Sequence, residues 1–118
     1  MQYNLDNIVF VFSEFADEDM QMESWFRLSS DGYDTSPDDM IGWIDDNLVA
    51  EWNEDIVKSV DPDLHRYIAD FVKRAQDGSD VDSDPWRSYS SPKWVELRLM
   101  AKVIVETIRE RMDALKSR

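Results

Sequence analysis

The sequence predicts an all-α domain of four to five helices, packed like a bundle, and three observations support this. Three helix starts share one signature, a capping side chain followed by proline, at Ser36-Pro37, Asp61-Pro62 and Ser91-Pro92. Long apolar stripes with a period near 3.6 residues follow these starts. The 118 residues are 42% hydrophobic and include five Trp, which is enough for one real core. We therefore treat residues 1–118 as a single acidic helical domain.

The N-terminal third fits two kinds of secondary structure. The run at residues 8–12 fits either a helix or a buried strand. We favour a helix because five polar residues fall together on one side, namely Asp6, Asn7, Ser13, Glu14 and Asp17. A second short helix should follow around Met22, Trp25 and Phe26, and residues 29–36 should form a loop.

Each proline start should open one long helix. In each, the Ser or Asp oxygen can accept free N–H groups of the first turn, and proline fits the first helical position. The helix from Pro37 should reach Val60, with a phase slip near Asn53. The helix from Pro62 carries an apolar stripe that ends near Gly78, and residues 78–91 should form a second loop. The last helix, from Pro92 to about Lys116, is apolar on nearly all sides, which predicts a central, buried C-terminal helix.

The sequence contains no catalytic or cofactor-binding motif. It has no Cys, three Gly and a single histidine, His65, which flanks an apolar stripe and is interpreted as a packed boundary residue. Asp80, Asp82 and Asp84 have the spacing of a calcium loop, but Pro85 and Ser91 replace its required Gly and Glu. We therefore expect no enzyme, no cofactor and no metal site.

Charge is distributed very unevenly along the chain. Residues 1–84 hold 22 acidic and 5 basic residues, a formal charge of −17, whereas residues 85–118 hold 4 acidic and 8 basic residues, a charge of +4. Such a surface repels bare nucleic acid and anionic membranes. No apolar run approaches the length of a membrane span, and the N-terminus lacks a basic signal region. We expect a cytoplasmic protein whose basic face, Arg98, Lys102 and Arg109, pairs internally with acidic helices.

Trp43 is the strongest candidate for a binding residue. On the Pro37 helix it would be surrounded by acidic and amide side chains, an arrangement typical of a binding hot spot for a cationic partner. The predicted partner-binding residues are Asp38, Asp39, Trp43, Asp46, Asn47, Glu51 and Glu54. The alternative is that Trp43 packs under residues 18–34. The acidic groups Glu14, Asp17 and Glu18, and Glu51, Glu54 and Asp55, are otherwise interpreted as charged surface.

The other aromatic residues are divided between surface and core. Trp86 and Tyr89, in a polar loop beside Arg87, form a second candidate for a binding surface. Trp25, Trp52 and Trp94 lie on apolar stripes and are expected in the core.

These features favour a non-catalytic acidic protein that neutralises a basic partner. Nucleic-acid-handling proteins carry Lys and Arg in their substrate grooves, so a nuclease-type toxin or a similar protein is the expected partner. In general character the chain resembles small acidic bacteriocin and contact-inhibition immunity proteins, without a matching family motif, and it would act as an immunity protein or antitoxin. Two alternatives stay open: a nucleic-acid mimic of phage type (anti-restriction or anti-CRISPR), and a small regulatory or scaffold subunit.

Overall fold

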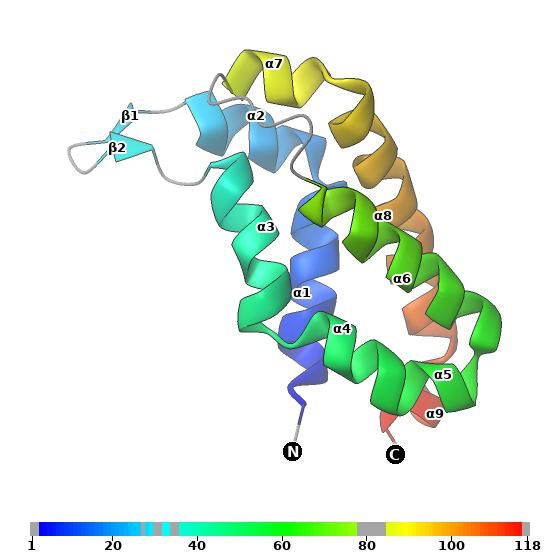
Figure 1. Cartoon of the computed structure of the whole chain (residues 1–118). Helices are drawn as coiled ribbons and strands as arrows, with labels where there is room; N and C mark the ends of the chain where they lie inside the picture. Colours follow the sequence, from blue (N-terminus) through cyan, green and yellow to red (C-terminus); the bar gives the residue numbers. More distant parts are fainter. Residues whose placement is uncertain (1–2, 27, 30–31, 34–35, 78–84, 117–118) are drawn as a thin grey trace.

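The computed structural model describes residues 3–26, 28–29, 32–33, 36–77 and 85–116, and it forms an all-α, bundle-like domain (Figure 1). The helices are α1 (Leu5–Ala16), α2 (Glu18–Phe26), α3 (Pro37–Asp46), α4 (Val49–Trp52), α5 (Lys58–Val60), α6 (Pro62–Gln76), α7 (Pro85–Ser90), α8 (Pro92–Glu110) and α9 (Met112–Lys116). A π-helix, η1 (Asn53–Val57), joins α4 to α5. Strands β1 (Leu28–Ser29) and β2 (Gly32–Tyr33) form a short antiparallel pair, with Leu28 opposite Tyr33.

The three predicted proline starts are confirmed. Ser36, Asp61 and Ser91 have extended backbones, and their side chains accept the backbone N–H groups of Asp39, Leu64 and Trp94. At α3 the arrangement is reciprocal, because a carboxylate oxygen of Asp39 accepts the Ser36 N–H at 3.1 Å. The local capping rule therefore predicts where α3, α6 and α8 begin.

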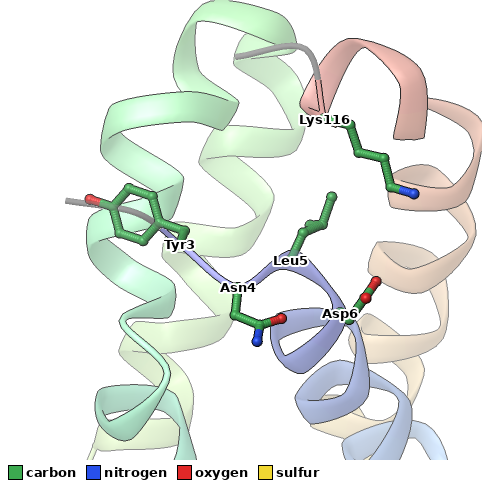
Figure 2. A pocket seen from close by; sticks show the side chains of 5 residues that line it. All are labelled: Tyr3, Asn4, Leu5, Asp6 and Lys116. Carbon is green, nitrogen blue, oxygen red and sulfur yellow. The ribbon is translucent and has the colours of Figure 1, made fainter.

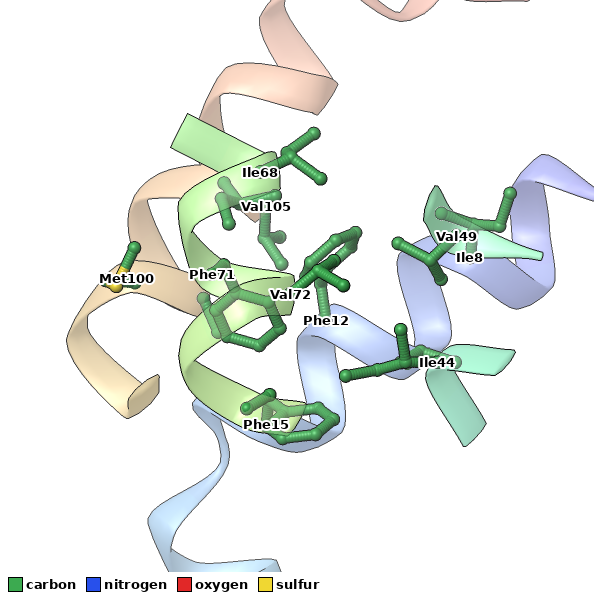
Figure 3. Close-up of a cluster of buried hydrophobic side chains, with 14 of the residues drawn as sticks. Ile8, Phe12, Phe15, Ile44, Val49, Ile68, Phe71, Val72, Met100 and Val105 are labelled. Atoms are coloured by element: carbon green, nitrogen blue, oxygen red, sulfur yellow. The ribbon is translucent and has the colours of Figure 1, made fainter. Parts of the chain in front are cut away.

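Residues 8–12 are helical, as favoured, and α1 lies in the middle of the domain beside α3 and α8 (Figure 1). The core forms where α1 meets α6 and α8 (Figure 3). Phe15 contacts Phe71 of α6 edge-on at 5.1 Å between ring centroids and stacks on Trp94 of α8 at 5.4 Å. Trp25 and Trp52 are buried with Trp94, so all three predicted core tryptophans are confirmed.

The single helix predicted from Pro37 to Val60 is wrong. α3 ends at Asp46, and Leu48 adopts a left-handed backbone with φ of 56°, which turns the chain before α4. The predicted phase slip near Asn53 coincides with η1, whose wider turn shifts the apolar register. In α3 the buried residues are Met40 and Ile44. The buried stripe therefore begins at Met40 and not at Ile41, as the sequence pattern had suggested.

The C-terminal helix is central in its contacts but is not buried on all sides. It ends at Glu110, and α9 follows after Arg111. α8 packs against α1 and α6 and supplies eight buried residues. Its second apolar stripe, Val95, Leu99 and Val103, is 44%, 61% and 45% exposed, so the expectation that both stripes are covered is wrong.

The two predicted loops are only partly loops. The first contains the β1–β2 pair, and the end of the second is α7. The calcium-like spacing of Asp80, Asp82 and Asp84, and the predicted stop at Gly78, lie outside the described residues.

Candidate functional site

An aromatic pair on the surface of α1 and α3 is the centre of the candidate site. The rings of Phe10 and Trp43 lie 6.4 Å apart between centroids and are inclined by 41°. Phe10 is 55% exposed, whereas Trp43 is half-buried and packs against the core. Phe10 lies on the opposite side of α1 from the buried stripe of Ile8, Phe12 and Phe15. Burial in the core therefore does not account for Phe10.

Acidic residues lie one helical turn to either side of each aromatic residue. Residues one turn away on a helix share a face, so Asp6 and Glu14 flank Phe10, and Asp39 and Asp46 flank Trp43. We call these four acids together with Phe10 and Trp43 the α1–α3 patch. It keeps the predicted residues Asp39, Trp43 and Asp46, and it adds Phe10, Asp6 and Glu14, which were not among the predicted partner-binding residues. A signal for Phe10 was present, because it falls off the helical stripe that contains Phe12.

Several acids lie at helix ends where negative charge is unfavourable. The last turn of α3 carries Asp45 and Asp46 and no basic residue, and the last turn of α1 likewise has none. A carboxylate near the C-terminal end of a helix is repelled by the helix dipole. Partial burial, together with the nearby charge of Asp17, raises the pKa of Glu14 above its ordinary value. The fold therefore tolerates electrostatic strain in the α1–α3 patch that a bound cation would relieve.

The other residues predicted around Trp43 have different positions or roles. Asp38 is exposed in the first turn of α3, where negative charge is favourable. Asn47 caps the end of α3 by donating from Nδ2 to the Trp43 carbonyl at 2.9 Å. Glu51 and Glu54 lie beyond the left-handed Leu48, on a separate segment, so they do not extend the α3 surface.

Glu54 instead connects η1 to α6. Its carboxylate lies 2.8 Å from Nε2 of His65 and 3.8 Å from Nζ of Lys58. The hydrogen bond with His65, followed by the nearby positive charges, lowers the pKa of Glu54. The imidazole of His65 is largely buried, as expected for a packed boundary histidine, and Asn53 donates to the His65 carbonyl at 2.9 Å.

One acidic group and one basic group also differ in arrangement from the prediction. Glu14, Asp17 and Glu18 do not share one helix, because Asp17 ends α1 and its carboxylate accepts the Met20 N–H of α2 at 2.9 Å. The predicted basic face is interrupted, because Arg98 is only 8% exposed.

Arg98 belongs to a buried polar network that sequence patterns did not reveal. Its guanidinium lies 4.5 Å from the centroid of the Tyr89 ring and donates to the Gln21 side-chain oxygen at 2.8 Å. It also donates to the Tyr89 carbonyl, and the Tyr89 hydroxyl donates to Glu18 at 2.7 Å. Burial lowers the pKa of Arg98. The network joins α2, α7 and α8, so Tyr89 has a structural role, while the Trp86 side chain lies outside the described part of the chain.

Two open hollows lie on the described part of the surface, and one of them adjoins the α1–α3 patch at Asp6. One, of about 440 Å³, is lined by Tyr3, Asn4, Leu5, Asp6 and Lys116, with the Leu5 side chain in its middle (Figure 2). The Tyr3 hydroxyl donates to Asp55, which raises the pKa of Tyr3 to about 12. The other, of about 210 Å³, lies between the end of α6 and the start of α8. Both are open and mainly polar, unlike the enclosed apolar pockets that bind small molecules.

The residues that the structure describes contain no cluster of three His, Asp or Glu placed to hold a metal ion. None of the helices in the described ranges is both long and apolar enough to cross a membrane. Comparisons with protein-family models, with curated proteins and with solved structures gave no match.

Proposed function

We propose that this chain is a non-catalytic binding protein that neutralises a basic protein partner through the α1–α3 patch. The observation that carries the proposal is the Phe10–Trp43 pair, with Phe10 55% exposed and carboxylates from two helices around it. Aromatic residues near the centre of an interface often supply most of the binding energy, and surrounding charges steer association.

The electrostatics of the patch favour a cationic occupant. Asp46 and Glu14 lie in last turns without a basic residue, where the helix dipole disfavours them. A lysine or arginine of a partner would reduce that repulsion at the same time as it formed new ion pairs. Because residues 1–84 carry a formal charge of −17, the long-range field would also speed the encounter with a basic protein.

The partner class that fits best is a nuclease-type toxin or another nucleic-acid-handling protein, with this chain acting as its immunity protein or antitoxin. Such proteins bind phosphates through Lys and Arg, so their grooves have the required charge. A nucleic-acid mimic is the alternative, and it would depend on carboxylates along an extended face. Central aromatic residues within the acidic surface favour the immunity-type interaction.

The test uses immobilised wild-type chain and three variants to capture basic proteins from the native host. Phe10→Ala and Trp43→Ala change the patch, and Met22→Ala is the control, because Met22 is another exposed apolar side chain at 38%. The captured protein is purified, its cleavage of DNA and RNA is measured, and the chain is titrated into the reaction. We expect stoichiometric loss of nuclease activity with wild type and Met22→Ala, and a weaker effect with the other two variants.

Different outcomes separate the alternatives. A captured protein whose activity is unchanged by the wild-type chain would contradict the inhibitor proposal. If the aromatic variants inhibit as wild type does, while Asp39→Asn with Asp46→Asn abolishes inhibition, the nucleic-acid mimic becomes the better description.

A further inference from the structure

The second exposed apolar surface of the domain lies on α8. Val95, Leu99 and Val103 are spaced by four residues, so their side chains form one continuous ridge along the helix. Each is more than 40% exposed, and Leu99, at the middle of the ridge, is 61% exposed. Large apolar side chains gathered in one contiguous strip indicate a contact surface more strongly than scattered ones do.

The charges beside this ridge are mixed. Glu96 lies on one flank of Leu99 and Lys102 on the other, three residues before and three residues after it. The carboxylate of Glu96 also pairs with Arg74 of α6 at 2.8 Å, and both side chains remain about half exposed. Glu106, which is exposed and lies four residues after Lys102, adds a carboxylate on the Lys102 side. The surface is therefore close to neutral, in a molecule whose formal charge is −13.

We propose that the α8 ridge is a homodimer surface that binds a second copy of this chain. Two i±4 ridges pack most commonly when the helices cross at about −50° with their ridges parallel. A two-fold axis parallel to the ridges then relates the two copies, and it places the Glu96 side of one α8 against the Lys102 side of the other. Glu96 of each copy therefore faces Lys102 of the other copy, twice in the dimer, with Leu99 at the centre.

Charge also explains why a second copy would use this surface and not the α1–α3 patch. Two acid-ringed patches would bring like charges together, which is unfavourable between copies. On the α8 ridge, Glu96 of one copy instead meets Lys102 of the other. Basic residues are concentrated in the chain segment that forms it, since residues 85–118 have a formal charge of +4.

The test is a charge-swap experiment read by sedimentation equilibrium in 0.15 M NaCl. Wild type should move with concentration from the 13.9 kDa of one chain toward twice that mass. Lys102→Glu places like charges on facing flanks at two positions, and Glu96→Lys does the same with the opposite sign. Each variant alone should raise the dimer dissociation constant by about tenfold or more.

The decisive measurement uses an equimolar mixture of the two variants. A heterodimer of Lys102→Glu with Glu96→Lys has opposite charges at both contacts, so association should return in the mixture. Lys73→Glu, an exposed change of the same charge on the outer side of α6, should dimerise as wild type does. Circular dichroism establishes that each variant is folded.

Three results would overturn the proposal. Wild type that stays monomeric up to millimolar concentration would exclude the dimer. A Lys102→Glu variant that associates as wild type does would exclude this surface. If each variant alone associates more weakly but the mixture does not recover, the proposed pairing of Glu96 with Lys102 between copies would be excluded. Leu99→Glu should abolish dimers without affecting partner capture by the α1–α3 patch, so the two proposals can fail separately.

Discussion

The α1–α3 patch and the α8 ridge both expose large apolar side chains, but the charges around them differ. Phe10 is 55% exposed and Leu99 is 61% exposed, so exposure alone does not distinguish the two surfaces. Phe10 and Trp43 lie among carboxylates, whereas Leu99 lies between Glu96 and Lys102. The acidic residues of the α1–α3 patch favour a cationic partner and repel a second copy of the same patch. The opposite charges on the two sides of the α8 ridge favour a second copy of the chain. The surrounding charge, more than the apolar area, therefore determines which partner each surface fits.

The largest expected effect tests whether α8 really has one buried and one exposed face. Leu97 is fully buried and Leu99 is 61% exposed, although they are two residues apart on the same helix. Leu97→Ala should lower the free energy of unfolding by ~2–5 kcal/mol, because it leaves a cavity. Leu99→Ala should change it by no more than ~0.5 kcal/mol. Urea denaturation at low protein concentration measures both, and similar losses would contradict an exposed ridge.

The next effect concerns the α1–α3 patch. Trp43→Ala should weaken binding of the captured basic partner by about 2 kcal/mol or more if Trp43 is a hot spot. Because Trp43 is half-buried, the variant should also lose part of the roughly 3–5 kcal/mol that truncation of a buried Trp costs in folding stability. Phe10→Ala is the cleaner probe, since its exposed ring should affect binding with little change in stability. Surface plasmon resonance gives the affinities, and thermal melts give the stabilities.

Local rules in the sequence predict most of the helices but little of the surface chemistry. The capping side chain and the proline that follows it affect only the next few residues of the chain, so Pro37, Pro62 and Pro92 are reliable signals of a helix start. The end of α3 is different, because the left-handed backbone of Leu48, which is not a glycine, has no sequence signal. Periodicity indicated the register shift at Asn53 but could not show that a π-helix produces it.

The sequence also predicted only the part of the candidate site that depends on local spacing. Asp39, Trp43 and Asp46 lie on one helix, so their proximity follows from spacing. The contact between Phe10 and Trp43 joins α1 to α3 and depends on the tertiary fold. Similarly, an apolar stripe such as Val95, Leu99 and Val103 does not reveal whether another helix covers it. Arg98 appeared to belong to a basic surface because its buried partners, Gln21 and Tyr89, are distant or irregularly spaced in sequence.

A smaller pair of effects should have opposite signs on the two surfaces. Asp46→Asn removes a carboxylate from the negative end of α3 and should raise stability by ~0.3–1 kcal/mol. Glu96→Gln removes the pair with Arg74 beside the α8 ridge and should lower stability by ~0.2–1 kcal/mol. Thermal melts in 0.01 M and 0.1 M NaCl measure both, and screening should reduce both differences. The same sign for both changes would show that the two surfaces do not differ electrostatically as described.

The smallest expected effect concerns Glu14, next to Phe10, and depends on pH. Burial raises the folded-state pKa of Glu14, so the folded protein favours its protonated form more than the unfolded chain does. The stability linked to this group is therefore present below the unfolded pKa, about 4.3, and is lost as pH rises through the folded pKa. Glu14→Gln, which is neutral at every pH, should melt at a higher temperature than wild type at pH 7.

The gain at pH 7 should stay below ~1 kcal/mol, because the side chain is partly exposed and solvent screens its charge. It should shrink as pH falls toward 4, because a growing fraction of Glu14 is then protonated in both states and resembles glutamine. Glu106→Gln on the outer side of α8 is the matched control, since Glu106 is exposed. Melting curves from pH 4 to 7 measure the difference between the two variants. If Glu14→Gln and Glu106→Gln follow the same curve, an unfavourable environment for the Glu14 carboxylate is not a distinguishing property of the α1–α3 patch, and the case for a cationic partner there is weakened.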